Sequence, residues 1–162
     1  LDAEFKETLP RMLSTFSLTT GRPTVRVFEG IDGIEEALND SLLAKGEIRT
    51  YVDNAAVIGD VLTVNDRYVK RRVAKKILKK MIVSDTPELR KLFATLVNEF
   101  TLVAFVPHFP ATFQSAMEIY DDTVSYMTLT PEKMIAVLLT DPAIASMEKQ
   151  KFDFLWSQYY AA

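Results

Sequence analysis

The spacing of apolar residues divides the chain into an N-terminal helix and a longer alternating region. Within residues 1–17 apolar side chains recur every three or four positions, a narrow helical stripe, at Leu1, Phe5, Leu9, Met12 and Phe16. A seam this narrow is typical of a helix that pairs with another helix. Pro10 would kink or restart the helix, and residues 19–23 form a clear break.

After the break, strand-like and helix-like patterns alternate. We expect strands at 25–28, 47–52, 81–83, 102–106, 116–120, 123–129 and 134–139. For residues 134–139 a helix opened by Thr130-Pro131 stays an alternative. We expect helices around 34–45, over 55–62, over 66–80 with Asp66 as N-cap, and after Asp85 and Asp141. This order predicts an α/β fold, a mixed and mostly parallel sheet flanked by helices.

The overall composition is that of one globular domain. The chain has 162 residues, of which 48% are hydrophobic and 25% charged, and no apolar run reaches the roughly 18 residues that span a membrane. It has no export signal and no cysteine, so we expect a cytoplasmic protein without disulfides or thiol-based metal sites. Since the chain starts at Leu1 and not at methionine, we expect it to continue a longer protein.

A glycine turn, F-E-G-I-D-G, follows the first expected strand at residues 28–33. A dinucleotide site needs G-x-G-x-x-G, but only Gly30 and Gly33 are present, and Glu29 and Asp32 would repel a phosphate. We therefore expect Gly30 to reverse the backbone and Asp32 to cap the next helix. Glu29 stands at the carboxyl end of a strand, where open α/β sheets bind ligands.

One segment is strongly basic although the net charge is −3: residues 67–80 hold eight basic and no acidic side chains. Three interpretations stay open. The segment is a solvated helix face, or a face that neutralises nucleic-acid phosphates, or it points an arginine toward the ligand end of the sheet. The arginines concerned are Arg67, Arg71 and Arg72.

Candidate catalytic groups are few. His108 is the only histidine, and no G-x-S-x-G motif accompanies it, so a Ser-His-Asp triad or a transition-metal site is disfavoured. His108 either packs locally in its loop or lines a pocket. Polar side chains near the expected strand ends are the better candidates for a ligand pocket, and we predict ligand-binding roles for Glu29, Tyr51, Asp53, Arg72 and His108.

Several stretches together resemble the C-terminal effector-sensing domain of TrmB-like transcriptional regulators. They are E-T-L-P-R-M-L-S-T-F (7–16), R-P-T-V-R-V-F-E-G-I-D-G-I (22–34), N-D-R-Y-V-K-R-R (65–72), M-E-I-Y-D-D-T-V-S-Y (117–126) and D-P-A-I-A-S-M-E-K-Q-K-F-D-F-L-W (141–156). The resemblance implies a phospholipase D-like fold without its chemistry, because the H-x-K-x-x-x-x-D motif of those enzymes is missing. It also implies a DNA-binding winged helix-turn-helix ahead of this chain.

These expectations combine into one functional hypothesis. Residues 1–20 would end a helical dimerisation linker, and residues 21–162 would form an effector-sensing domain that is not an enzyme and needs no cofactor or metal. The resemblance implies a homodimer through the N-terminal helix, a small-molecule effector such as a sugar or sugar phosphate, and DNA contact only through the preceding domain. The alternatives are a hydrolase or transferase that uses carboxylates such as Glu29 and Asp53, and a dimerisation module without a ligand.

Overall fold

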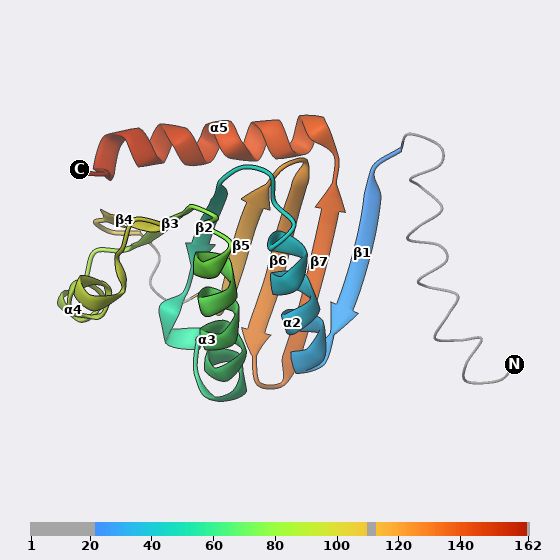
Figure 1. The fold of residues 1–162 in the computed structure, drawn as a ribbon, viewed down its shortest axis with the longest axis horizontal. Coiled ribbons are helices and arrows are strands. Elements are labelled where there is room, and N and C mark those ends of the chain that lie inside the picture. The colour runs from blue at the N-terminus through green and yellow to red at the C-terminus, as the bar shows by residue number, and fades with distance from the viewer. Residues whose placement is uncertain (1–21, 110–112, 162) are drawn as a thin grey trace, which may run out of the picture.

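A computed structural model describes residues 22–109 and 113–161 (Figure 1). The expected linker, residues 1–20, lies outside the described residues. The strands are β1 (Thr24–Glu29), β2 (Ile48–Val52), β3 (Lys79–Ser84), β4 (Thr101–Val106), β5 (Ser115–Tyr120), β6 (Thr123–Thr130) and β7 (Lys133–Thr140). The helices are α2 (Gly30–Ser41), the short 3-10 helix η2 (Asn54–Ala56), α3 (Gly59–Ala74), α4 (Pro87–Leu96) and α5 (Pro142–Tyr159).

The described strands form one seven-stranded mixed sheet in the order β1-β7-β6-β5-β2-β3-β4. The prediction of a mixed sheet flanked by helices is confirmed, but "mostly parallel" is wrong. Only β2–β3 and β3–β4 pair in parallel, and the other four pairs are antiparallel. The physical reason is the connections: a short turn reverses the chain between β5, β6 and β7, whereas a helix crossover is needed for parallel neighbours.

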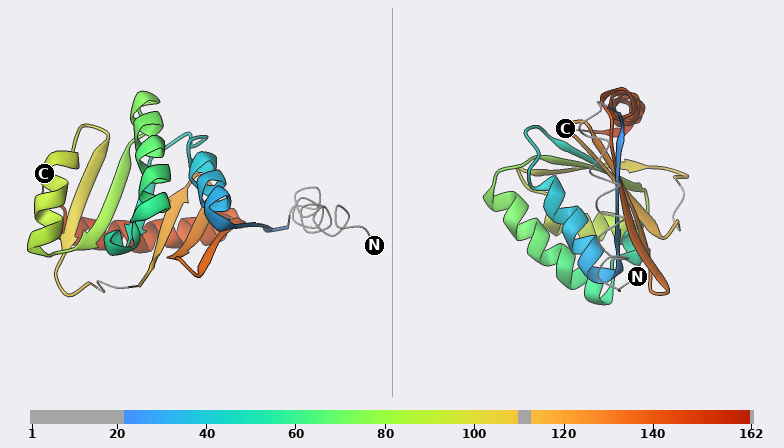
Figure 2. Two further views of the ribbon diagram at one scale, coloured as in Figure 1. Left: turned by 90° about the horizontal axis from the view of Figure 1, so that it is seen from below. Right: turned by 90° about the vertical axis from the view of Figure 1, so that its right-hand side faces the viewer.

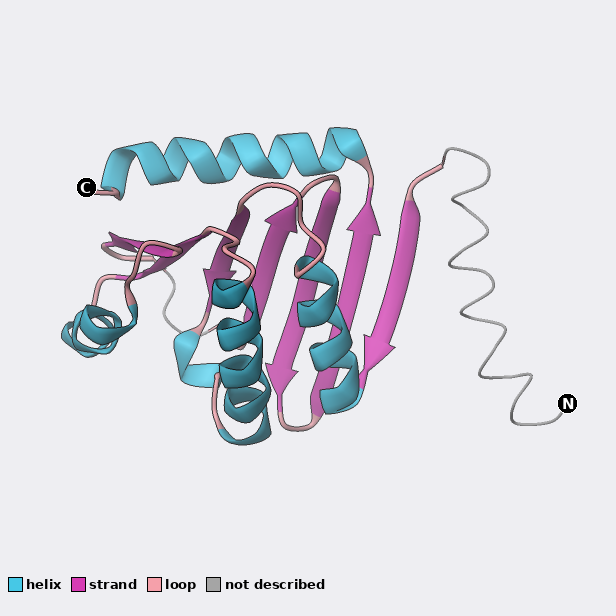
Figure 3. Ribbon diagram, in the orientation of Figure 1, coloured by secondary structure: helices cyan, strands magenta, loops and turns pink. Residues whose placement is uncertain are grey.

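The helices cover the two faces of the sheet unequally (Figure 2). Helices α2 and α3 lie beside each other over one face, as Figure 3 shows. There the buried side chains Ile34 and Val61 pack against Met127 and Leu138 of the sheet. On the opposite face α5 packs through Phe152 and Trp156 on a second core, which includes Ile82, Ile119 and Val124.

Helix α3 replaces the two helices predicted over residues 55–62 and 66–80. It begins after Ile58 and runs unbroken through Asp66, so Asp66 is not an N-cap. The buried stripe that holds it to the sheet is Val61, Val64, Tyr68 and Arg72, with the three- and four-residue spacing of one continuous helix. The helix ends at Ala74, and Lys79 and Lys80 belong to β3.

The start of α2 also differs from the expectation. Its N-cap is Glu29, whose side chain makes no capping hydrogen bond, and Asp32 lies inside the first turn. A carboxylate in the first turn still stabilises the helix through its dipole. Gly30 has φ +71°, which confirms that this glycine makes the backbone reversal.

Helix α2 is tied to the sheet by Asp40. Arg26 of β1 donates two hydrogen bonds to this carboxylate, at 2.9 and 3.1 Å, and the Tyr120 hydroxyl of β5 donates a third at 2.6 Å. Burial alone would raise the pKa of Asp40, but the hydrogen bonds from Arg26 and Tyr120 outweigh it, so the pKa of this carboxyl is lowered from 3.8. Helix α2 is thereby fixed to both β1 and β5.

Part of the basic segment is paired or buried within the fold. Arg67 pairs with Glu35 at 3.0 Å, Arg71 donates to Asn39, and Lys80 pairs with Glu47 at 3.1 Å. Lys79 and Arg72 are buried. Paired and buried cations are poor phosphate ligands, so the structure assigns a structural role to Arg67, Arg72, Lys79 and Lys80. The other four cations, Lys70, Arg71, Lys75 and Lys76, are exposed, so the solvated-face and nucleic-acid interpretations both stand for them.

Candidate functional site

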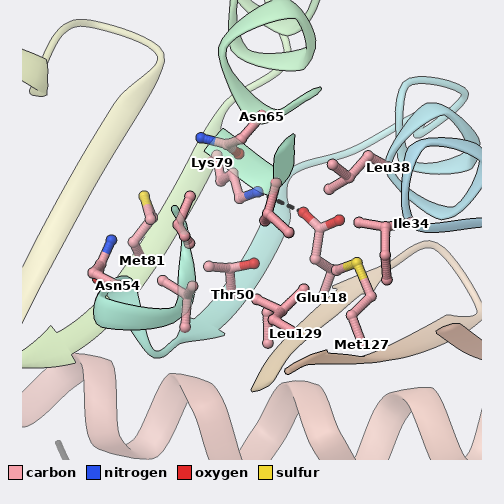
Figure 4. Close-up of a pocket in the computed structure, with 14 residues that line it drawn as sticks. Ile34, Leu38, Thr50, Asn54, Asn65, Lys79, Met81, Glu118, Met127 and Leu129 are labelled. Carbon is pink, nitrogen blue, oxygen red and sulfur yellow. Dashed lines mark hydrogen bonds and ion pairs between the residues drawn. The ribbon is translucent and has the colours of Figure 1, made fainter. Parts of the chain in front are cut away.

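A cavity of about 80 Å³ lies between the sheet and the helix pair α2 and α3 (Figure 4). Helix α2 contributes Ile34 and Leu38, α3 contributes Val61 and Asn65, and residues of β2, β3, β5 and β6 form the floor. Most of the wall is apolar: Ile34, Leu38, Val52, Val57, Val61, Met81, Ala116, Met127 and Leu129. Concave, largely apolar sites with a few polar groups are the usual form of small-molecule sites.

An ion pair between Lys79 and Glu118 lines this cavity, with Nζ and Oε2 2.5 Å apart (Figure 4). The side chains are only 9% and 1% exposed, respectively, so both charges are removed from water. Burial disfavours the charged ammonium and lowers the pKa of Lys79, and the neighbouring Glu118 offsets only part of that effect. Removing two charges from water is costly, and buried pairs of this kind are weak contributors to stability.

The ion pair is part of a larger buried polar cluster. The Tyr68 hydroxyl of α3 donates to Glu118 Oε2 at 3.3 Å and lies 2.9 Å from the Ser41 hydroxyl of α2. Burial, together with the Glu118 carboxylate, raises the pKa of Tyr68 well above 10.0, so the phenol stays a neutral donor. The cluster therefore links both helices to β3 and β5 through hydrogen bonds.

Two buried acceptors at this cavity have no partner among the described residues. They are Glu118 Oε1 and Asn54 Oδ1, and both residues line the cavity. A buried polar atom without a hydrogen bond costs about 1–3 kcal/mol, and such atoms in a native fold call for an explanation. A ligand that donates a hydrogen bond would satisfy the acceptor that it reaches.

A second cavity of about 260 Å³ adjoins the first, between α3, α4 and β3. The two share Asn54, Asn65, Lys79 and Met81 as lining residues. A ligand larger than the first cavity has room to extend past Lys79 toward α4.

Arg72 lines the second cavity. Its guanidinium donates to the carbonyls of Ile77 and Phe100 at 2.8 and 2.6 Å, and to the Thr101 hydroxyl at 2.7 Å. These acceptors lie at the amino ends of β3 and β4. Burial lowers the pKa of Arg72 below its usual range. This arginine ties the end of α3 to the beginning of two strands, at the edge opposite the strand ends where it was predicted.

Asp53 and Tyr51 are also held by other protein groups. The buried Asp53 carboxylate accepts from the backbone amides of Ala55, Phe113 and Gln114 at 3.1, 3.0 and 2.8 Å. Tyr51 faces α5: its ring stacks on Phe109 and meets Phe152 edge-on, with centroids 5.9 and 5.2 Å apart. Burial raises the pKa of Tyr51 to about 12.

Glu29 and His108 are exposed at opposite edges of the sheet. Glu29 ends β1, whereas His108, with φ 60°, follows β4. Of the five residues predicted to bind a ligand, Glu29, Asp53 and Arg72 line three different cavities, so these three do not form one pocket. Whether any of the five contacts a ligand stays a prediction.

The sequence analysis did not predict that Lys79 and Glu118 line a cavity. Lys79 falls in the helix predicted over 66–80, although it begins a strand in which Lys79, Met81 and Val83 share one face. Glu118 stands in the middle of the strand A-M-E-I-Y, and a lone carboxylate inside an apolar strand was the available signal.

Residues 22–109 and 113–161 contain no cluster of three or more histidine, cysteine or acidic side chains suited to a metal ion. No helix in these ranges is both long and apolar enough to cross a membrane.

No protein-family model matches the chain, and no curated protein matches it. Among solved structures, Nuc from Salmonella typhimurium, a phospholipase D family member, superposes with a TM-score of 0.60 at 17% identity, over 85% of this chain and 97% of its own. NucT from Helicobacter pylori gives 0.60 at 11% identity, over 87% of this chain and 100% of its own. The chain has a phospholipase D-like fold.

A third solved structure covers more of the chain. TrmBL2, an archaeal chromatin protein described as showing a novel mode of DNA binding, superposes over 98% of this chain with a TM-score of 0.56 at 18% identity. The chain spans 62% of the length of TrmBL2. Similarity at identities this low shows a common fold, and the function has to be argued from the residues of the site.

Proposed function

We propose that this chain is the ligand-sensing and dimerisation domain of a TrmB-like transcriptional regulator, with a DNA-binding domain preceding it. The observation that carries the proposal is the similarity to TrmBL2 over 98% of the chain. The cavity at Lys79 and Glu118 supplies a place for the effector, and residues 1–20 supply the seam for pairing two copies. The regulator would touch DNA only through the preceding domain.

The mechanism follows from how the cavity is built. Its walls come from α2, α3 and the sheet, and α2 continues directly from β1, the strand that follows the linker. A ligand that binds one arrangement of α2 and α3 more tightly than another shifts the population toward that arrangement. The Asp40 hydrogen bonds pass this shift to β1, and so to the orientation of the paired linkers.

Phosphodiester hydrolysis is the rival function because Nuc and NucT share the fold. The chain has one histidine, His108, followed by Phe109 and Pro110, so the H-x-K part of the phospholipase D motif is missing. His108 also lies outside the Lys79–Glu118 cavity. This residue pattern favours a binding role over catalysis.

Isothermal titration against a panel of sugars and sugar phosphates tests the proposal. We expect at least one compound to bind, and we expect no turnover of bis(p-nitrophenyl) phosphate by the wild-type chain or by His108→Ala. Absence of binding throughout the panel together with turnover lost in His108→Ala would establish the hydrolase. Absence of both would leave the dimerisation module.

A further inference from the structure

We propose that the Lys79–Glu118 cavity binds a small uncharged molecule with an apolar body and at least two hydroxyl groups. The inference rests on the proposed sensing function and names the chemistry of the ligand that the same site takes. It follows from three properties of the cavity: its charge balance, its unpartnered acceptors and its size.

The charge balance excludes a charged ligand from the first cavity. Among the described residues, Lys79 and Glu118 are the only ionisable side chains in its lining, and they neutralise each other at 2.5 Å. A carboxylate, phosphate or ammonium group would enter an apolar site as an unpaired charge, which is strongly unfavourable. An uncharged molecule meets no such penalty.

The unpartnered acceptors favour a ligand that donates hydrogen bonds. Glu118, 1% exposed, offers Oε1, and Asn54 offers Oδ1, and neither oxygen has a protein partner among the described residues. Each oxygen can accept a hydrogen bond from an O–H or N–H group. The two residues lie on different sides of the cavity (Figure 4), so two hydroxyl groups held apart by the body of the ligand match them without adding charge.

The volume of the cavity and the apolar residues that line it limit the size and polarity of the ligand. A cavity of about 80 Å³ holds about five to eight groups of the size of water. Its remaining wall is formed by aliphatic and thioether side chains, among them Ile34, Met127 and Leu129, which favour carbon over further polar groups. A diol or short polyol of four or five carbons fits these limits.

Butane-1,4-diol is the probe, titrated into isotopically labelled chain while the methyl signals of Ile34, Met127 and Leu129 are followed by NMR. A ligand of this size is expected to bind in about the millimolar range. Three matched compounds accompany it: butan-1-ol, with one hydroxyl fewer, 4-hydroxybutyrate, which is an anion, and 4-aminobutan-1-ol, which is a cation. We expect saturable shifts with the diol, binding about tenfold weaker with butan-1-ol, and no saturable shifts with the anion or the cation.

Two variants locate the effect. Asn54→Leu removes one acceptor, so the diol should lose its roughly tenfold advantage over butan-1-ol while butan-1-ol still binds. Ala116→Leu fills the cavity and leaves every polar group in place, so neither alcohol should bind. Asn54 and Ala116 lie on different elements, so if one variant fails to fold, the other still tests whether the diol binds in this cavity.

The outcomes separate this inference from the proposed function. Equal binding of the diol and its charged counterparts, or unchanged diol binding by Ala116→Leu, overturns the inference. If the diol shows no saturable shift but a compound of the sugar panel binds, the ligand class is wrong and the sensor stands. If neither the diol nor the panel binds, both fail.

Discussion

Replacing Glu118 by alanine is expected to lower the free energy of unfolding by about 3–5 kcal/mol. The variant leaves the Lys79 ammonium buried, at 9% side-chain exposure, without its partner, and an uncompensated buried charge is among the costliest defects in a protein. The double variant Lys79→Met/Glu118→Leu removes both charges and should lie close to the wild type. Urea-induced unfolding measures both.

The pH dependence of this defect gives a second readout. In Glu118→Ala burial lowers the pKa of Lys79, and no carboxylate opposes that effect. As the pH rises, the folded state therefore loses the Lys79 proton before the unfolded state, in which Lys79 has its ordinary pKa of 10.5. The unfolded state then binds more protons, and stability rises with pH. The deficit against the wild type should shrink between pH 7 and pH 10. A deficit of less than about 1 kcal/mol that does not change with pH would contradict the buried pair.

Replacing Arg72 by methionine is expected to cost about 3 kcal/mol, since it removes three hydrogen bonds, two to half-buried carbonyls and one to a buried hydroxyl. The acceptors belong to Ile77, Phe100 and Thr101, so the end of α3 loses its attachment to β3 and β4. Arg72→Lys should restore little, because one ammonium cannot reproduce the planar fork of a guanidinium. Chemical denaturation provides the measurement.

The neighbouring Arg71 is the matched control for Arg72. It lies on the same helix but is exposed, and its side chain donates to Asn39 on the surface. Arg71→Met should change stability by no more than about 0.5 kcal/mol. Equal losses in the two variants would show that removing any charge from α3 destabilises the domain, and would refute the anchoring role of Arg72.

The local elements of the fold could be predicted from the sequence, whereas their pairing could not. All seven strands were expected within two residues of their bounds, because alternating apolar positions and turn residues such as Asp121-Asp122 are local signals. Strand direction depends on which distant segments pair, so the antiparallel β1–β7 pairing was not visible. The unbroken course of α3 was missed because Asp66 looked like a cap.

The candidate site was harder to predict because it is defined by contacts between distant residues. Lys79 and Glu118 are 39 positions apart and meet only because β2 lies between β3 and β5 in the sheet. The predicted residues were chosen for their places at strand ends, and Asp53 shows the weakness of that rule. Its carboxylate is occupied by three backbone amides, a role that a sequence pattern does not distinguish from ligand binding.

The central claim is that an effector binds in the cavity between α2, α3 and the sheet. Thermal unfolding of the wild type, of Ala116→Leu and of Met117→Leu, with the sugar panel extended by short polyols, tests it most directly. Ala116 lines the cavity, whereas Met117 packs on the opposite face of the sheet. A ligand present at 100 times its dissociation constant stabilises by about 2.7 kcal/mol, which raises Tm by about 5–10 °C in a domain of this size. We predict such a rise for at least one compound in the wild type and Met117→Leu, and none in Ala116→Leu. An equal rise in all three proteins would place the site elsewhere, and no rise with any compound would contradict ligand sensing.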